Sequence, residues 1–248
     1  MLTNKTIIVT GGTKGIGKSI VLEFLKHGAH VIAVYSKDNI AAERMKDHLS
    51  EDEQNRLFLY KGSINDVGFI KGLLKEIEAK FGRLNVLINN AGINRDNLFL
   101  DMEEDDWNSV MATNLKGTLN MSLFAAEIMK KSTEPSYIIN ISSISGVFGR
   151  AGQANYACSK GAIIGMTKLL AKKFAEHSIF VNAIVPGLIR TDMMEDMPEE
   201  KIEEISNATI LKRLGEPQEV AKTALFLVSG DFSYVSGACI KVDGGYLK

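Results

Sequence analysis

Tyr156, Lys160 and Ser143 are the residues whose types and spacing can perform chemistry. Tyr156 and Lys160 lie four residues apart, and Ser143 lies thirteen residues before Tyr156. Residues four apart share one face of a helix, so the Lys160 ammonium can lie beside the Tyr156 phenol. A unit charge at roughly 4 Å and an effective dielectric near 20 is worth about 4 kcal/mol, which would lower a tyrosine pKa from about 10 toward about 7. The spacing therefore predicts a phenol that donates a proton to a carbonyl group at neutral pH.

A glycine-rich segment near the N-terminus is the second chemical signal. The segment TGGTKGIG, residues 10–17, follows an apolar run and opens a stretch with helical spacing at Ile16, Ile20, Val21, Phe24 and Leu25. Strand, glycine turn and helix form the context of a dinucleotide-binding turn, in which the helix N-terminus stabilises a pyrophosphate. Alone, such glycines can be ordinary turn residues, and a Tyr-x-x-x-Lys pair is more typical of a solvated helix face. Together the two signals indicate an oxidoreductase.

Composition bounds the class of protein. The chain has 248 residues and no Pro-, Gly- or Ser-rich linker, which predicts a single domain over residues 1–248. Lys plus Arg number 29 against 30 for Asp plus Glu, a balance that gives no support for a nucleic-acid partner. Cys158 and Cys239 lack the spacing of a disulfide framework or a metal site. We see no signal peptide or long apolar span in the sequence, so we expect a cytoplasmic protein with no membrane partner.

Short apolar, β-branched runs alternate with segments of helical spacing. The runs, which predict strands, are residues 5–10, 30–35, 57–61, 85–89, 137–142, 179–184 and 238–242. This alternation predicts an α/β fold, a doubly wound seven-stranded parallel sheet with helices on both faces. Ligands of such sheets bind at the carboxyl ends of the strands, where we expect Gly11, Asn89, Ser143 and Pro186.

These residues resemble the motifs of the short-chain dehydrogenase/reductase family, in order, from residue 6 to residue 246. The matching motifs are TGGTKGIG at 10–17, NNAG at 89–92, Asn114, Ser143, Tyr156 with Lys160, and Pro186-Gly187 followed by Thr191. Within the family, residues 90–97, 152–156, 235–237 and 242–246 most resemble 3-oxoacyl-acyl-carrier-protein reductases. The resemblance implies a single-domain Rossmann fold and chemistry on ketones and alcohols.

The resemblance implies catalytic roles residue by residue. Tyr156 would donate the proton in reduction, and Lys160 would lower the pKa of Tyr156 and hold the nicotinamide ribose. Ser143 would bond the substrate oxygen as it becomes alkoxide-like. Asn114 is similar to the family's helix-kinking residue that holds a water in a proton relay toward Lys160, or it is a satisfied buried amide. The expected substrate contacts are Ser143, Gln153, Tyr156 and Met193.

The resemblance also implies a nicotinamide cofactor, which supplies the hydride. The residues expected to bind it are Gly11, Thr13, Lys14, Gly15, Ile16, Gly17, Ser36, Lys37, Ser63, Ile64, Asn89, Ala91, Gly92, Tyr156, Lys160, Pro186, Gly187, Ile189 and Thr191. We expect NADP(H), because the second strand continues into Ser36 and Lys37 without an acid and Lys14 lies in the glycine turn. Counted along the chain from the glycine turn, Asp38 lies where the acid of an NAD site is expected. The register of the second strand puts Asp38 beyond that position, so we expect it to cap the next helix.

Departures from the family pattern concern the adenine pocket and the substrate. Ser63-Ile64 replaces the usual Asp-Val at the adenine pocket. Ser132 stands where carrier-protein reductases commonly carry an arginine, so docking of a carrier would depend on lysines that can equally form a solvated face. These are Lys130, Lys131, Lys172 and Lys173. The segment 188–214 is expected to be a substrate lid, whose methionines 193, 194 and 197 either line an acyl site or pack the lid on the body.

The sequence thus favours NADPH-dependent reduction of a 3-oxoacyl thioester, carried on acyl carrier protein, in fatty-acid or related biosynthesis. Two alternatives stay open: an enzyme acting on another ketone or alcohol, such as acetoacetyl-CoA, or a cofactor-binding protein without turnover. The complete set of Asn114, Ser143, Tyr156 and Lys160 argues against the last, since binding alone needs no proton donor. The resemblance also implies a homotetramer built through the Tyr156 helix and the C-terminal strand.

Overall fold

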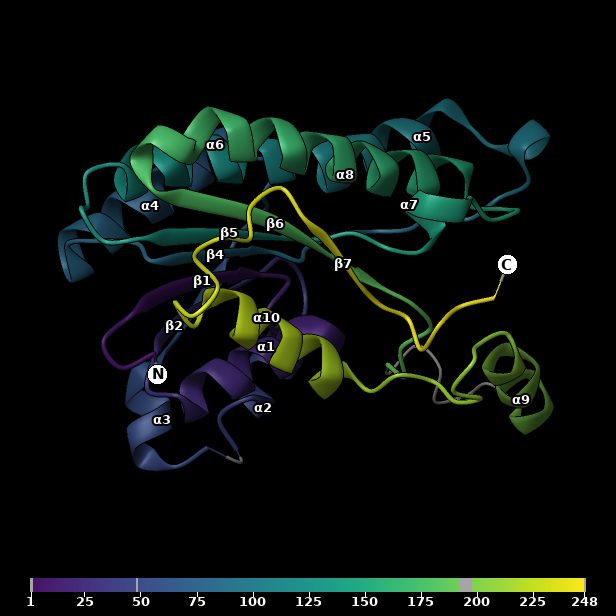
Figure 1. Cartoon of the computed structure of the whole chain (residues 1–248), viewed down its shortest axis with the longest axis horizontal. Helices are drawn as coiled ribbons and strands as arrows, with labels where there is room; N and C mark the ends of the chain where they lie inside the picture. The colour runs from purple at the N-terminus through teal and green to yellow at the C-terminus, as the bar shows by residue number, and fades with distance from the viewer. Residues whose placement is uncertain (1, 48, 192–197, 248) are drawn as a thin grey trace.

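The strands form one layer between two layers of helices (Figure 1). The computed structural model describes residues 2–47, 49–191 and 198–247. Within these residues, seven parallel strands form one sheet in the order β3-β2-β1-β4-β5-β6-β7. The strands are β1 (Thr6–Thr10), β2 (His30–Tyr35), β3 (Leu57–Lys61), β4 (Val86–Asn89), β5 (Ser136–Ile141), β6 (Ile179–Pro186) and β7 (Cys239–Val242). The predicted fold class, a doubly wound parallel sheet with helices on both faces, is confirmed.

The main helices divide between the two faces of the sheet. In Figure 1, α4 (Val67–Phe81), α6 (Thr118–Met129) and α8 (Ala154–Phe174) lie above the sheet, and α1 (Gly15–Lys26) and α10 (Pro217–Val228) lie below it. The shorter helical segments are α2 (Asn39–Arg44), α3 (Glu51–Arg56), η1 (Phe99–Asp101), α5 (Glu104–Val110), η2 (Met111–Gly117), α7 (Ser145–Phe148), η3 (Ala175–His177) and α9 (Glu199–Asn207).

Alternate strand residues fill two hydrophobic cores. In β1, Ile7 and Val9 join the core between the sheet and helices α1 and α10, whereas Ile8 joins the core between the sheet and helices α4, α6 and α8. All three side chains are fully buried, because successive side chains of a strand point to opposite faces and both faces are covered. This double burial explains why the strands read as continuous apolar runs in the sequence.

The predicted strand bounds agree with the structure within two residues. The largest difference is at β6, which continues to Pro186 instead of ending at residue 184. The reason is tertiary pairing, since β7 adds to the sheet edge in a register that matches Pro186 with Val242. This extension carries β6 directly to the segment expected to bind the cofactor.

The glycine turn after β1 is closed by contacts that leave little room for a side chain at Gly11 and Gly17. Gly11 has a φ of +62°, in the left-handed region that favours glycine. A Cβ on Gly17 would lie 2.1 Å from the Gly11 carbonyl oxygen and 2.5 Å from Asn90 Nδ2. The start of α1 therefore packs directly on the glycine turn and on the segment that follows β4.

Replacing Gly17 by alanine should lower the free energy of unfolding by roughly 1–3 kcal/mol, because the added methyl group forces the turn backbone to move. Gly72→Ala is the matched control, since a Cβ on Gly72 of α4 meets no atom within 4 Å among the described residues. That variant should be more stable by roughly 0.5–1 kcal/mol. Urea denaturation followed by circular dichroism measures both, and equal stabilities would contradict the close packing at Gly17.

Candidate active site

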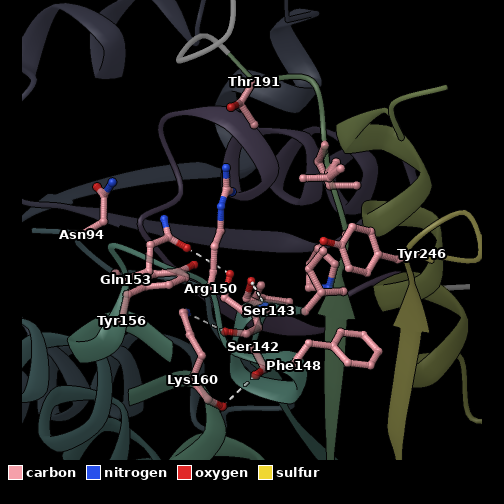
Figure 2. A pocket seen from close by; sticks show the side chains of 18 of the residues that line it. Asn94, Ser142, Ser143, Phe148, Arg150, Gln153, Tyr156, Lys160, Thr191 and Tyr246 are labelled. Atoms are coloured by element: carbon pink, nitrogen blue, oxygen red, sulfur yellow. Dashed lines mark hydrogen bonds between the residues drawn. The ribbon is translucent and has the colours of Figure 1, made fainter. Parts of the chain in front are cut away.

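A cavity of about 500 Å³ lies at the carboxyl ends of β4, β5 and β6 (Figure 2). This is where ligands of a doubly wound sheet bind, and the volume is typical of a small-molecule site. The predicted site residues that line it are Ile16, Gly92, Ser143, Gln153, Tyr156, Lys160, Pro186, Gly187, Ile189 and Thr191. The structure therefore brings together residues from five distant parts of the sequence.

Lys160 lies at the floor of the cavity and is almost fully buried. Its Nζ atom donates a hydrogen bond to the main-chain oxygen of Ile141 at 2.8 Å. Ser142 Oγ donates to the main-chain oxygen of Lys160 at 2.8 Å, which ties α8 to the end of β5. Burial lowers the pKa of Lys160 to about 8, because a low-dielectric environment disfavours the charged form.

The pKa shift of Tyr156 has the opposite sign to the one predicted. Burial raises the pKa of the Tyr156 phenol, a hydrogen bond with the Ser143 side chain lowers it, and the Asp96 carboxylate raises it. The Lys160 Nζ atom is directed at Ile141 and lies 5.6 Å from the centre of the Tyr156 ring. Helical spacing placed the two residues on one helix face but did not show the burial that raises the pKa of the phenol.

Gln153 connects the cavity to an acid that the sequence prediction did not include. Its Nε2 atom donates to Asp96 Oδ2 at 2.8 Å, and its Oε1 atom accepts from Ser145 Oγ at 3.0 Å. The Ser145 main-chain N–H in turn donates to Ser143 Oγ at 3.1 Å. Gln153, predicted as a substrate contact, is thus held between Asp96 and the serine segment beside Tyr156.

Asn114 is fully buried in the π-helical segment η2. Its Oδ1 atom accepts from the Ile93 N–H at 2.8 Å, and its Nδ2 atom donates to Ile93 O at 2.9 Å and to Ser159 Oγ at 3.1 Å. A Cβ on Gly92 would lie 3.2 Å from Asn114 Oδ1 and 3.5 Å from Lys160 Nζ. Asn114 is therefore a satisfied amide, and it also fixes the chain next to Lys160.

The glycine turn and the segment after β6 approach each other at the carboxyl edge of the sheet. A Cβ on Gly15 would lie 3.4 Å from Thr191 Cγ2. Thr13 is buried within the turn, and the Ala91 main-chain N–H donates to Thr10 Oγ1 at 3.0 Å. The turn is a cradle of main-chain atoms that leaves little room for a side chain at Gly11 and Gly17, which fits a pyrophosphate at the N-terminus of α1.

The end of β2 carries the groups that would distinguish the two nicotinamide cofactors. Ser36 and Lys37 are exposed there. Lys14 forms an ion pair with Asp38, whose carboxylate also accepts from the Ala41 N–H at 2.9 Å. The prediction that Asp38 caps a helix is confirmed, and the Ala41 bond and Lys14 hold the pKa of Asp38 below its usual range.

Two of the residues predicted to bind the cofactor have side chains that point into the protein. Ile64 is buried against Gly117 of η2, whereas Ser63 is exposed. Asn89 is also buried, and its Nδ2 atom donates to Ser122 Oγ and Asn140 Oδ1, both at 2.9 Å. The Asn89 side chain faces the core, so its main chain is the part available to a cofactor.

The cavity wall also contains residues that the sequence prediction missed. They include Phe148 and Arg150 before α8, Glu204, Ile205 and Ala208 from α9 to its C-cap, and Tyr246 near the C-terminus. The predicted lid does contribute Leu188, Ile189, Thr191 and α9, but Met193, Met194 and Met197 lie outside the described residues. The wall assembles from two short helices, a turn and the C-terminal segment, which are far apart in the sequence and share no periodic pattern.

The lysines considered for carrier docking differ in their surroundings. Lys130 pairs with Glu127, and Lys131 pairs with Glu78 at 2.6 Å. Lys172 and Lys173 are exposed in the last turn of α8. The second pair is therefore the one open to a partner.

The fold and the cavity define a dinucleotide-binding oxidoreductase. Residues 11–247 match the protein family described as enoyl-(acyl carrier protein) reductase. The chain is 42% identical to the 3-oxoacyl-[acyl-carrier-protein] reductase FabG of Thermotoga maritima, over 98% of both chains. It is 37% identical to the protein of that name from Staphylococcus aureus Mu50, over 99% of both, and 36% identical to that of Salmonella typhimurium, over 97% of this chain and 96% of the other. The chain belongs to the short-chain dehydrogenase/reductase family, whose members bind a nicotinamide cofactor and act on CH–OH and C=O groups.

Two further features of the described residues concern metals and membranes. No group of three or more His, Cys, Asp or Glu side chains is placed there to hold a metal ion. No helix in this part of the chain is long and apolar enough to cross a membrane.

Asp96→Asn should lower the pKa of Tyr156, because the carboxylate charge that raises it is removed while the amide oxygen still accepts from Gln153. Ultraviolet difference spectroscopy of phenolate formation measures the shift, with Tyr156→Phe as the reference for subtraction. Asp101→Asn is the control, because Asp101 is an exposed acid of the same segment and is not among the groups that shift the pKa of Tyr156. An unchanged or raised midpoint in Asp96→Asn would contradict the electrostatic connection.

Proposed function

We propose that the protein reduces 3-oxoacyl thioesters to 3-hydroxyacyl thioesters with NADPH. The proposal is carried by one observation: Ser143, Tyr156 and Lys160 line the same cavity. Ile16, which follows the glycine turn, and the segment after β6 line this cavity too. The names of the similar proteins support the thioester substrate and its carrier. A cofactor-binding protein without turnover would have no use for a proton donor in this place.

The residues around the cavity fit a nicotinamide cofactor. Gly11, Gly15 and Gly17 would receive the pyrophosphate, and Pro186 to Thr191 would hold the nicotinamide end. The cofactor supplies the hydride when bound. Gly92, Ala91 and the main chain of Asn89 would follow the adenosine half, with Ser63 and Ile64 at its adenine end.

Tyr156 and Ser143 would handle the oxygen of the substrate. Tyr156 would donate its proton to the ketone oxygen, and Ser143 would bond the same oxygen as negative charge develops on it. Lys160 is charged below about pH 8, where it favours the phenolate that remains after proton donation. Asn114 would position the chain beside Lys160, on the path by which Tyr156 regains a proton after donation.

We infer that the carrier of the thioester docks near the exposed end of α8. Lys172 and Lys173 lie there as free positive groups of the described surface, and an acyl carrier protein is an acidic partner. Mutual attraction of this kind increases the rate of association more than the final affinity. The homotetramer implied by the family resemblance remains part of this proposal.

Tyr156→Phe should reduce turnover of acetoacetyl-CoA by at least about 100-fold, because the general acid is lost. Binding of NADPH, measured by calorimetry, should change little, since the phenol contributes one hydroxyl to a large site. Turnover is followed through the absorbance of reduced nicotinamide. Full activity in the variant would exclude Tyr156 as the proton donor, and no activity in the unchanged protein would exclude this substrate.

Asp38→Asn should tighten NADPH binding severalfold. The change releases Lys14 from its ion pair and removes a negative charge that would repel the 2′-phosphate. Asparagine also caps helices, so α2 should be preserved. Lys14→Gln should have the opposite effect on NADPH. NADH serves as the control cofactor in kinetic measurements of KM, and it should respond little to either change. Preference for NADH in the unchanged protein would overturn the NADP assignment.

A further inference from the structure

Arg150 is a charged residue of the cavity wall, in the turn between α7 and α8. Figure 2 shows its side chain extending from that turn, beside Gln153, in the direction of Thr191. The turn is anchored on both sides, since the Gly149 N–H donates to Ser145 O at 2.9 Å and the Gln153 N–H donates to Arg150 O at 3.1 Å. The guanidinium is therefore presented to the cavity from a fixed base.

Within the described part of the chain, no carboxylate forms an ion pair with Arg150. Other arginines do have such partners, namely Arg56, Arg83, Arg190 and Arg213. Asp96, the acid behind Gln153, accepts from the Gln153 amide, and Glu204 on the α9 wall has a contact of its own. Arginine recognises carboxylates and phosphates through two parallel hydrogen bonds. Because Arg150 has no ion pair among the described residues, its positive charge is available to an anionic ligand.

One side of the cavity carries apolar side chains. Figure 2 shows Phe148 and Tyr246 across the cavity from Gln153 and Tyr156, and the two rings lie 5.7 Å apart. Ile205 and Ala208 add aliphatic surface from the α9 side. An apolar side of the cavity together with an arginine that has no ion pair among the described residues fits a ligand that combines an uncharged chain with a negative group.

We propose that Arg150 binds an anionic group of the substrate and makes the cavity selective for charged ketones over neutral ones. The group is a phosphate or a carboxylate, because each can offer two oxygens that accept two parallel hydrogen bonds from the guanidinium. This inference rests on the proposed function, because it assigns a selectivity to the same reacting site. Arg150 acts in binding, and the proton chemistry stays with Tyr156.

The test compares three ketones that differ in charge. Acetoacetyl-CoA carries phosphates, free acetoacetate carries a carboxylate, and acetoacetyl-N-acetylcysteamine has the same thioester without charge. For Arg150→Gln we expect kcat/KM to fall about tenfold or more for a charged substrate, mainly through KM, and to change little for the neutral thioester. Loss with acetoacetyl-CoA identifies the phosphate as the ligand, and loss with acetoacetate identifies the carboxylate.

Two further variants make the result specific. Arg150→Lys retains the charge and should recover part of the selectivity, which a structural role would not show. Arg95→Gln is the matched control, because Arg95 is exposed, does not line the cavity, and has no ion pair among the described residues. Equal effects of Arg150→Gln on all three ketones, or no effect on any, would overturn the inference. Failure of the unchanged protein to reduce any of them would instead overturn the proposed function.

Discussion

The connection between the ends of β1 and β4 is the constraint on which the site depends. Thr10 Oγ1 accepts hydrogen bonds from the main-chain N–H groups of Asn90 and Ala91, both at 3.0 Å. Asn90 Nδ2 donates back to Thr10 O at 3.0 Å and to Gly11 O at 3.1 Å. These bonds hold the glycine turn against the segment after β4 at the point where the strand order reverses. Because β5 and β6 follow in register, the serine segment and Pro186 reach the same edge.

Electrostatics inside the cavity result from burial as much as from pairing. Lys160 is a buried amine whose hydrogen bond to Ile141 offsets part of the cost of desolvation. Tyr156 is a phenol in the same environment, and burial moves its pKa away from neutrality. The site thus contains an amine whose pKa is lowered and a phenol whose pKa is raised by the same burial. Asp96, through Gln153, adds a negative charge that reinforces the second effect.

Much of the fold and part of the site could be predicted from the sequence. The strands were predictable because both faces of a parallel sheet are buried, which leaves continuous apolar runs such as Ile7 to Val9. Asp38 was recognisable as a helix cap because capping is a local interaction. Neither the inward orientation of Asn89 nor the Asp96–Gln153 bond was predictable, since each joins side chains that are far apart in the sequence.

The sequence by itself determined the alternation of strands and helices in the doubly wound sheet, the glycine turn, and the shared helix face of Tyr156 and Lys160. These features follow from short-range spacing, which fixes the faces of helices and strands before any tertiary contact forms. Only the tertiary structure decided the sign of the Tyr156 pKa shift, the pairing of Lys14 with Asp38, and the place of Arg150 in the cavity wall. These depend on burial and on distances between separate elements, and neither quantity is encoded in the spacing of residues along the chain.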